Sequence, residues 1–158
     1  MLATIDTKKT VNAWSALGVR RASGNALPQV DMDGSIMLPQ GHKGPAFLVY
    51  DNFRIILKWN RSINYAICVG HLADRLAGLP EIANGKNADN EPLSRFDIKQ
   101  MQWHLNFFGF EAGPVDGLVG SRTKAALRSF QAAHSLPADG YPALDLLHLM
   151  KAQARALL

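Results

Sequence analysis

A polar stretch in the middle of the chain most constrains its folding, because it separates two short segments with apolar periodicity. Residues 79–92 are rich in Asn and are bracketed by prolines, which is typical of a linker. We therefore divide the 158-residue chain into residues 1–80, a linker at 81–92 and residues 93–158. Each segment is small, so its stability depends on how completely it can enclose a core.

The composition excludes several classes of protein. With 47% hydrophobic and 19% charged residues, the chain is neither disordered nor collagen-like. No apolar run reaches the ~18 residues of a membrane span, so we expect no transmembrane segment, and residues 1–14 show no apolar core of a secretory signal. The single Cys68 cannot form an intrachain disulfide.

The net charge of +4 would permit an acidic partner. The basic residues are scattered, however, whereas a nucleic-acid-binding surface usually clusters them on one face. We therefore expect no nucleic-acid partner. A basic nucleic-acid-binding domain stays open as an alternative, and it predicts DNA binding that falls steeply with salt.

The C-terminal segment has the pattern of three helices. Ser94 and Asp97 match a capping box, and the apolar residues after them recur with helical spacing as far as Gly109, which suits a helix end. A second helix is expected to start near Ser121, and a third to hold Pro142 in its first turn. The second helix is expected to carry Thr123, Leu127, Phe130 and His134 on one stripe. The third is expected to bury Leu144, Leu147 and Met150 or neighbouring leucines.

Two Asp-Gly pairs form a weak internal repeat of turn plus helix. Asp116-Gly117 and Asp139-Gly140 stand 23 residues apart, each just before an expected helix. The Asp of such a turn can accept hydrogen bonds from backbone N–H groups, and the Gly tolerates a positive φ. Ordinary turn chemistry explains these pairs as well as a binding function does.

The N-terminal segment mixes strand and helix signals. Residues 45–50 predict a short buried strand, and a second brief strand is expected near 35–38. Asn52 is expected to cap a helix, although the isoleucine pair that follows also suits a strand. Ser62 is expected to cap a longer helix through Leu76. One face of that helix would carry Ile63, Ala66, Ile67, Gly70, Ala73 and Leu76.

No metal or cofactor motif is found. A calcium loop with Gly34 at its sixth position would lack both the first carboxylate and the bidentate Glu. The five histidines, at positions 42, 71, 104, 134 and 148, do not have the spacing of zinc ligands. We therefore expect neither a metal nor a cofactor.

Catalytic acids are also missing from the pattern. Hydrolysis of a sugar bond needs a carboxylic acid of raised pKa in a walled cleft. Of the three glutamates, Glu81 and Glu91 lie in the linker and Glu111 lies in a short loop between helices. We therefore assign no catalytic residue.

The C-terminal segment resembles the small peptidoglycan-binding domain of three helices. The matching residues are Met101-Gln102, Leu105, Gly109-Phe110, Val115-Asp116-Gly117, Gly120, Thr123, Ala126, Phe130-Gln131, Leu136 and Asp139-Gly140. The resemblance implies that the substrate-binding residues include Asp116, Gly117, Thr123, Phe130, Gln131, Asp139 and Gly140. After Gly140 the sequence Tyr-Pro-Ala-Leu replaces the usual Gly and Thr, so the second half of the binding groove departs from the family form.

Residues 9–78 resemble the C-terminal end of the catalytic domain of lytic murein transglycosylases of the membrane-bound B type. The residues that carry the resemblance are Trp14, Leu17-Gly18-Val19-Arg20, Leu38-Pro39, Gly44-Pro45-Ala46-Phe47-Leu48, Asn52-Phe53, Trp59-Asn60, Ser62 and Tyr65-Ala66. It implies that Asn60 and Tyr65, beside Trp59, line a saccharide cleft. On the alternative interpretation Trp59 and Tyr65 are core aromatics and Asn60 only ends a helix.

Such enzymes use one Glu as general acid and then as base, which leaves a 1,6-anhydro sugar, and that Glu belongs upstream of the matched region. The expected fold class is therefore mainly α: the remnant of a lysozyme-like catalytic domain followed by a three-helix domain. The expected function is binding of peptidoglycan, through glycan strands or stem peptides, without cleavage by this chain alone. The alternative is a working part of an active transglycosylase completed by an upstream catalytic segment. A periplasmic or envelope location follows from the resemblance.

Overall fold

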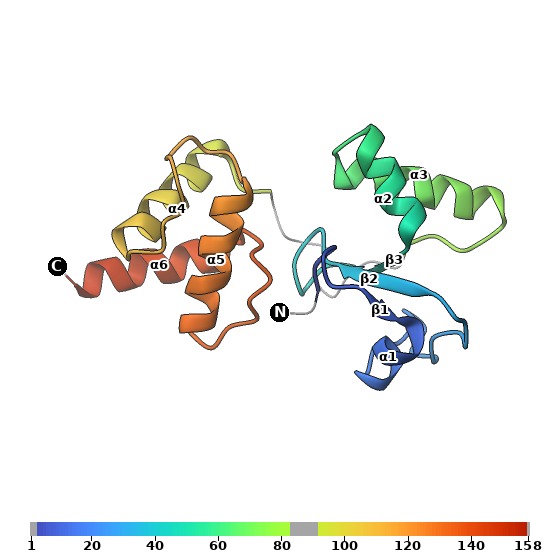
Figure 1. Cartoon of the computed structure of the whole chain (residues 1–158). Helices are drawn as coiled ribbons and strands as arrows, with labels where there is room; N and C mark the ends of the chain where they lie inside the picture. The colour runs from blue at the N-terminus through green and yellow to red at the C-terminus, as the bar shows by residue number, and fades with distance from the viewer. Residues whose placement is uncertain (1–2, 83–91, 158) are drawn as a thin grey trace. The chain divides into compact units, whose positions relative to one another are not determined.

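The computed structural model describes residues 3–82 and 92–157, which form two compact units, Met1–Lys86 (unit 1) and Asn87–Leu158 (unit 2). The division falls inside the predicted linker, of which residues 83–91 lie outside the described residues. The elements are β1 (Lys9–Thr10), α1 (Val11–Ala16), β2 (Asp33–Met37), β3 (Phe47–Val49), α2 (Asp51–Trp59), α3 (Ile63–Leu76), α4 (Arg95–Phe107), α5 (Ser121–Ala133) and α6 (Leu144–Ala156) (Figure 1). The expected mainly helical class with short strands is confirmed.

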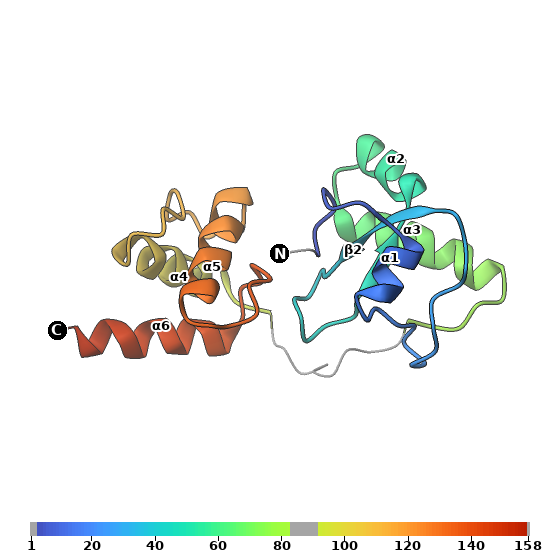
Figure 2. The same cartoon turned by 60° about the horizontal axis from the view of Figure 1, so that its bottom comes forward.

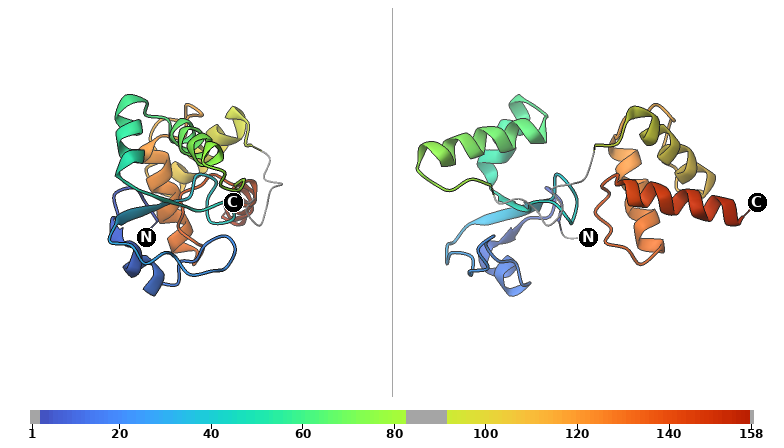
Figure 3. Two further views of the ribbon diagram at one scale, coloured as in Figure 1. Left: turned by 90° about the vertical axis from the view of Figure 1, so that its right-hand side faces the viewer. Right: turned by 180° about the vertical axis from the view of Figure 1, so that it is seen from behind.

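Unit 1 is built on a small antiparallel sheet of order β1-β2-β3. Neighbouring side chains on a strand point to opposite faces, and β2 uses both faces. Ile36 packs with residues of α1, whereas Met37 packs with residues of α2 and α3. Figures 1 and 3 show α1 on one side of the sheet and α2 with α3 on the other. Unit 1 therefore holds two small clusters rather than one core.

The first cluster depends on elements that the apolar pattern alone does not predict. Its buried members are Val11, Trp14, Leu27 and Ile36. Thr10 caps α1 by accepting a hydrogen bond from the Ala13 amide, and Trp14 Nε1 donates to the Gly34 carbonyl at 2.8 Å. A two-residue strand and a six-residue helix are too short to show a period, so only tertiary contacts reveal them.

The start of α2 differs from the prediction. The helix begins at Asp51 after the extended residue Tyr50, so Asn52 lies in the first turn, where its Oδ1 accepts from the Phe53 amide at 2.8 Å. The strand interpretation of the isoleucine pair is wrong, because both residues lie within the helix. Ser62, by contrast, caps α3 as predicted.

Helix α3 buries only part of its apolar face. Ala66 is fully buried, and Ile63 and Ile67 pack against the second cluster. Leu72 and Leu76 are 62% and 82% exposed. The apolar face expected along the helix is therefore covered only in its N-terminal half.

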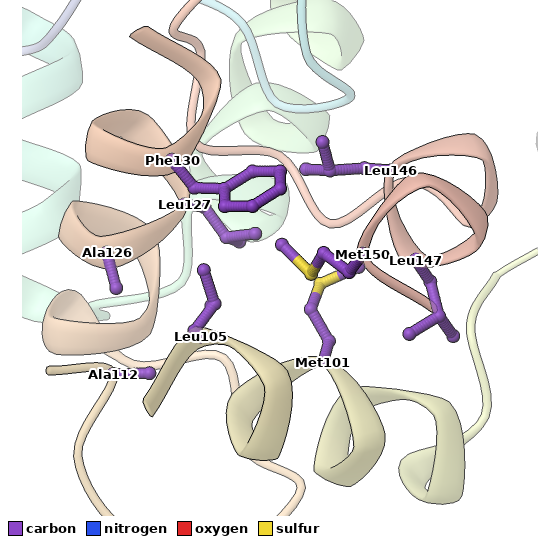
Figure 4. Packing of buried hydrophobic residues seen from close by; sticks show 9 residues of the cluster. All are labelled: Met101, Leu105, Ala112, Ala126, Leu127, Phe130, Leu146, Leu147 and Met150. Carbon is purple, nitrogen blue, oxygen red and sulfur yellow. The ribbon is translucent and has the colours of Figure 1, made fainter. Parts of the chain in front are cut away.

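Unit 2 encloses a single core between its three helices. Its buried members are Met101, Leu105, Ala112, Ala126, Leu127, Phe130, Leu146, Leu147 and Met150 (Figure 4). In two views the axis of α5 runs across those of α4 and α6 (Figures 1 and 2). The predicted capping box is present, since Ser94 and Asp97 exchange both bonds, and Gly109 follows α4 with φ of 82°.

The third helix starts later than predicted. Ala143 is the extended N-cap residue of α6 (φ −110°, ψ 151°), so Pro142 precedes the helix instead of entering its first turn. Leu146, Leu147, Met150 and Ala154 form the buried stripe. Leu144 lies ~100° around the helix from the centre of that stripe and is 43% exposed. The expected stripe is therefore present with the neighbouring Leu146 buried in place of Leu144.

Candidate functional site

The first Asp-Gly turn is held by a glutamine from α4. Gln102 Nε2 donates to Asp116 Oδ1 at 3.0 Å, and Gln102 Oε1 accepts from the Gly117 amide at 2.8 Å. The same Asp116 oxygen accepts from the Leu118 amide at 2.8 Å, which closes the turn. One buried side-chain amide therefore satisfies both a carboxylate and a backbone donor. We call Gln102, Asp116 and Gly117 the first clasp.

The second Asp-Gly turn repeats this arrangement with a glutamine from α5. Gln131 Nε2 donates to Asp139 Oδ1 at 2.7 Å, and Gln131 Oε1 accepts from the Gly140 amide at 2.8 Å. Asp139 Oδ1 also accepts from the Tyr141 amide at 2.9 Å. Gln131, Asp139 and Gly140 form the second clasp. The weak repeat in the sequence is therefore a structural repeat of turn, helix and glutamine.

Both glycines lie directly against the helix that supplies the glutamine. Gly117 and Gly140 have φ of 79° and 72°, a region that favours glycine. A Cβ on Gly117 would lie 2.8 Å from the Arg95 carbonyl oxygen, and a Cβ on Gly140 would lie 2.8 Å from that of Lys124. Both the backbone conformation and the close approach therefore require glycine at each turn.

A pair of basic residues flanks each clasp, a feature that the sequence analysis missed. The side-chain stems of Arg95 and Lys99 lie against Gly117, and that of Arg128 lies against Gly140. Arg95 Nε also donates to the Asp116 carbonyl at 3.1 Å. The sequence does contain a signal for this feature. Two basic residues four positions apart are followed, three positions later, by Gln, and this spacing occurs at 95-99-102 and again at 124-128-131.

Two further predicted binding residues lie inside unit 2. Thr123 is 2% exposed, and its Oγ1 accepts from Gln102 Nε2 at 3.2 Å, so it joins the first clasp to α5. Phe130 is completely buried in the core (Figure 4) and stacks on the His134 ring with centroids 4.1 Å apart. Phe130 is therefore a core residue that packs beneath the clasps instead of lying at the surface. A direct contact of the clasp residues with a ligand stays a prediction.

Hydrogen bonding sets the electrostatics of the first clasp. The bond from Gln102 is the largest cause that lowers the pKa of Asp116, followed by the bond from the Leu118 amide, with the Arg95 charge adding to it. These bonds favour the ionised carboxylate. Because two donors converge on Asp116 Oδ1, this carboxylate serves the turn as an internal acceptor.

The three predicted saccharide-contacting residues of unit 1 come together at the corner between α2 and α3. Trp59 ends α2 and is 83% exposed, and Tyr65 is 38% exposed. Their ring centroids are 6.4 Å apart at an interplanar angle of 35°. Asn60 is the C-cap residue of α2, and its Oδ1 accepts from the Ser62 amide at 3.1 Å. The interpretation of Trp59 and Tyr65 as core aromatics is therefore wrong for unit 1 as described.

The described acidic residues form neither a catalytic nor a metal-binding cluster. Glu81 and Glu111 are exposed, while Glu91 lies outside the described residues. Within residues 3–82 and 92–157, no three His, Cys, Asp or Glu side chains are placed to hold a metal ion. Over the same residues, no helix combines the length and apolar character needed to cross a bilayer.

Comparison with family models assigns both units. Residues 1–74 match the model described as "Transglycosylase SLT domain", and residues 94–149 match "Putative peptidoglycan binding domain". The predicted fold class is therefore confirmed: a lysozyme-like domain of the transglycosylase SLT type is followed by a small three-helix domain of the peptidoglycan-binding type.

Two similar solved structures are of SltB3 from Pseudomonas aeruginosa. The complex with NAG-anhNAM-pentapeptide is 40% identical with a TM-score of 0.84, and the alignment covers 95% of this chain and 40% of that chain. The complex with NAG-NAM-pentapeptide is 41% identical with a TM-score of 0.84, covering 94% and 40%. This chain thus spans less than half of the SltB3 chain.

A curated relative has a different description. The "Putative OxPP cycle protein OpcA" of Nostoc punctiforme is 32% identical over 74 residues, which are 47% of this chain and 15% of that protein. Because the alignment covers so little of that protein, it indicates at most a shared domain. The family models and the solved structures, which agree with each other, therefore carry the assignment.

Proposed function

We propose that this chain binds peptidoglycan through unit 2, and that unit 1 is the C-terminal portion of a lytic transglycosylase catalytic domain of the membrane-bound B type. The observation that carries the proposal is the SltB3 alignment, which runs through both units at 40% identity over 95% of the chain. SltB3 was solved with fragments that contain both sugars and a pentapeptide. The ligand class is therefore peptidoglycan, through its glycan strand or its stem peptide, and the proposed location is the periplasm or cell envelope.

We further propose that this chain does not cleave the MurNAc–GlcNAc bond alone. A general acid must reach the glycosidic oxygen from the wall of a cleft, where burial keeps it protonated. Glu81 and Glu111 are exposed, and neither lines a described hollow. No described glutamate therefore has the environment that this reaction needs.

Sedimentation with purified sacculi tests the binding. The full chain should pellet with sacculi at low salt and be released by soluble muropeptides. A chain that stays entirely in the supernatant would overturn the proposal. Duplex DNA serves as the comparison ligand, because the nucleic-acid alternative predicts binding to DNA that falls steeply with salt. In the same reactions, chromatography should detect no anhydro-muropeptides, and their release would overturn the proposed inactivity.

A second candidate function has its own support in unit 1: part of an active enzyme, completed by a segment that carries the catalytic Glu. Ile55, Leu72 and Leu76 are 65%, 62% and 82% exposed on α2 and α3. Large apolar side chains left exposed on a small unit are candidates for contact sites. The alignment leaves more than half of the SltB3 chain uncovered, and such a remainder is the kind of segment that would cover them.

Mixing this chain with the uncovered remainder of SltB3 tests this candidate. If it is right, the mixture releases anhydro-muropeptides that neither part releases alone, and Leu76→Asp prevents the release. Leu118→Asp is the matched control, because Leu118 is 60% exposed in unit 2. Absence of both complex and product on mixing would refute completion and leave the binding function standing.

A further inference from the structure

Helix α4 carries a row of exposed aromatic residues. Phe96, Trp103 and Phe107 are 67%, 51% and 49% exposed. Seven and four residues separate them, which places all three on one helix face. Met101 and Leu105, from the opposite face, are fully buried in the core. Large apolar side chains exposed on one face are candidates for an interaction site, and Trp103 is the member of this row that also lines a hollow.

Two of these three rings pack against each other. Trp103 and Phe107 are stacked, with centroids 5.3 Å apart and an interplanar angle of 11°. His104 meets the indole edge-on, with centroids 5.0 Å apart at 80°. Phe107 lies one turn toward the C-terminus, so it supports the indole from that side. The indole of Trp103 is therefore held in place before any ligand arrives.

A hollow lies on the other side of the indole. Its volume is about 400 Å³, and it is lined by Lys99, Gln100, Trp103, His104 and Val115. Lys99 and Gln100 precede Trp103 by one helical turn, whereas Phe107 follows it by one turn. One ring face therefore rests on Phe107 while the ring also walls the hollow. The hollow is open to solvent, so a ligand bound there would keep one face exposed.

The lining combines one apolar wall with polar groups. Gln100 offers an amide, and Lys99 brings a positive charge to a lining without an acidic residue. The stem of Lys99 also lies against Gly117, since a Cβ there would be 3.2 Å from Lys99 Cγ. The hollow therefore adjoins the first clasp, although its lining contains no clasp residue.

We propose that this hollow binds an N-acetylmuramyl group that carries no stem peptide, which is a pyranose ring with an acetamido group and a free lactyl carboxylate. The inference rests on the proposed peptidoglycan binding and names the subsite and the sugar. The apolar face of the pyranose stacks on Trp103, Gln100 bonds the acetamido or hydroxyl groups, and Lys99 pairs with the carboxylate. A stem peptide alone has no flat ring for the indole, and an apolar helix would leave Lys99 and Gln100 without partners.

Titration of the ¹⁵N-labelled full chain with the disaccharide NAG-NAM tests the subsite. The Trp103 indole N–H signal should shift on binding, and Trp103→Ala should weaken binding about tenfold, because it removes the apolar surface on which the pyranose ring stacks. Phe96→Ala is the matched control: it removes an exposed ring from the same face but outside the hollow, and it should leave the affinity within about twofold.

A second comparison isolates the charge. The disaccharide NAG-NAG lacks the carboxylate, so Lys99→Met should reduce NAG-NAM affinity to that for NAG-NAG and leave NAG-NAG binding unchanged. Val115→Glu, which places a carboxylate in the lining, should disfavour NAG-NAM in particular. The unperturbed signals of α5 and α6 report whether each variant is folded.

Three results would overturn the subsite: no shift of the Trp103 signal with NAG-NAM, equal affinity of Trp103→Ala and the parent chain, or binding of the free pentapeptide at the Trp103 signal in place of the sugars. Sacculus sedimentation separates this failure from that of the proposed function. If the parent chain pellets with intact sacculi, and the parent chain and Trp103→Ala pellet equally with sacculi stripped of stem peptides by an amidase, peptidoglycan binding stands and the subsite is wrong. If the parent chain does not pellet, the proposed function itself fails.

Discussion

The two clasps of unit 2 share the same local bonds but differ in how they connect to the next helix. In the first clasp, Gln102 Nε2 also donates to the Leu118 carbonyl at 3.0 Å and to Thr123 Oγ1 at 3.2 Å. In the second clasp, the hydrogen bonds described for the Gln131 side chain are those to Asp139 and Gly140. The glutamine of the first clasp therefore joins α4, the turn and α5.

This difference separates two tasks that one motif can perform. Glutamine, aspartate and glycine suffice to fix the turn, since both copies form it with the same bonds. Fixing the next helix needs a further partner, which is Thr123 in the third position of α5. After Gly140, just before α6, the sequence departs from the family form that it resembles. We therefore expect the first clasp to contribute more to stability than the second.

The largest effect is expected where both clasps are alike, at their glycines. Gly117→Ala and Gly140→Ala should each lower the free energy of unfolding of unit 2 by ~2–4 kcal/mol, because the new Cβ adds a clash to the cost of a left-handed conformation. Gly109→Ala is the control: its φ is 82° but a Cβ there meets nothing within 4 Å, so ~1 kcal/mol is expected. Hydrogen exchange of the slowest amides in α4–α6 measures these values. Equal losses at all three positions would contradict the close approach.

The glutamines should separate the two clasps. Gln102→Met removes the side-chain amide that bonds to four groups, and it should lower the free energy of unfolding by ~2–3 kcal/mol. Gln131→Met removes an amide that bonds to two groups, and it should lower the free energy of unfolding by ~1–2 kcal/mol. Methionine keeps the shape of the side chain, so packing changes little. The same exchange measurement applies. A Gln131 variant as damaging as the Gln102 variant would mean that the link to α5 adds nothing.

The turns and their glutamines also show what the sequence could predict. Asp-Gly is local, so residues adjacent in sequence indicate the turn. Gln102 lies 14 residues from Asp116, and only a packed structure, or the repeated spacing of basic residues and glutamine, brings them together. The capping box at Ser94 was predictable for the same local reason. The burial of α3 was not, because exposure of Leu76 depends on what packs against unit 1 rather than on helical period.

A smaller effect is expected from the link itself. Thr123→Val keeps the shape of the side chain but removes the oxygen that accepts from Gln102, and Thr123 is buried. We expect a loss of ~1 kcal/mol in the free energy of unfolding of unit 2, measured by exchange of the α5 amides. Thr123→Ser retains the hydroxyl and is the matched control. In the background of Gln102→Met the substitution should cost much less, since its partner is already gone; full additivity would refute the link.

The smallest effect expected is a change in the pH dependence of the first clasp. The fold lowers the pKa of Asp116 from its ordinary 3.8, chiefly through the bond from Gln102. A carboxylate with a lowered pKa stabilises the fold above the unfolded pKa, and that contribution is lost as the pH falls through the folded pKa. Unit 2 should therefore weaken as the pH falls below ~4.

Gln102→Met should raise the pKa of Asp116 toward the ordinary value, measured by NMR titration of the side-chain carboxyl carbon. The pKa of Asp97, lowered chiefly by the hydroxyl of Ser94, should not move. If instead the Asp116 midpoint stays where it was, the hydrogen bond from Gln102 is not what holds this carboxylate ionised.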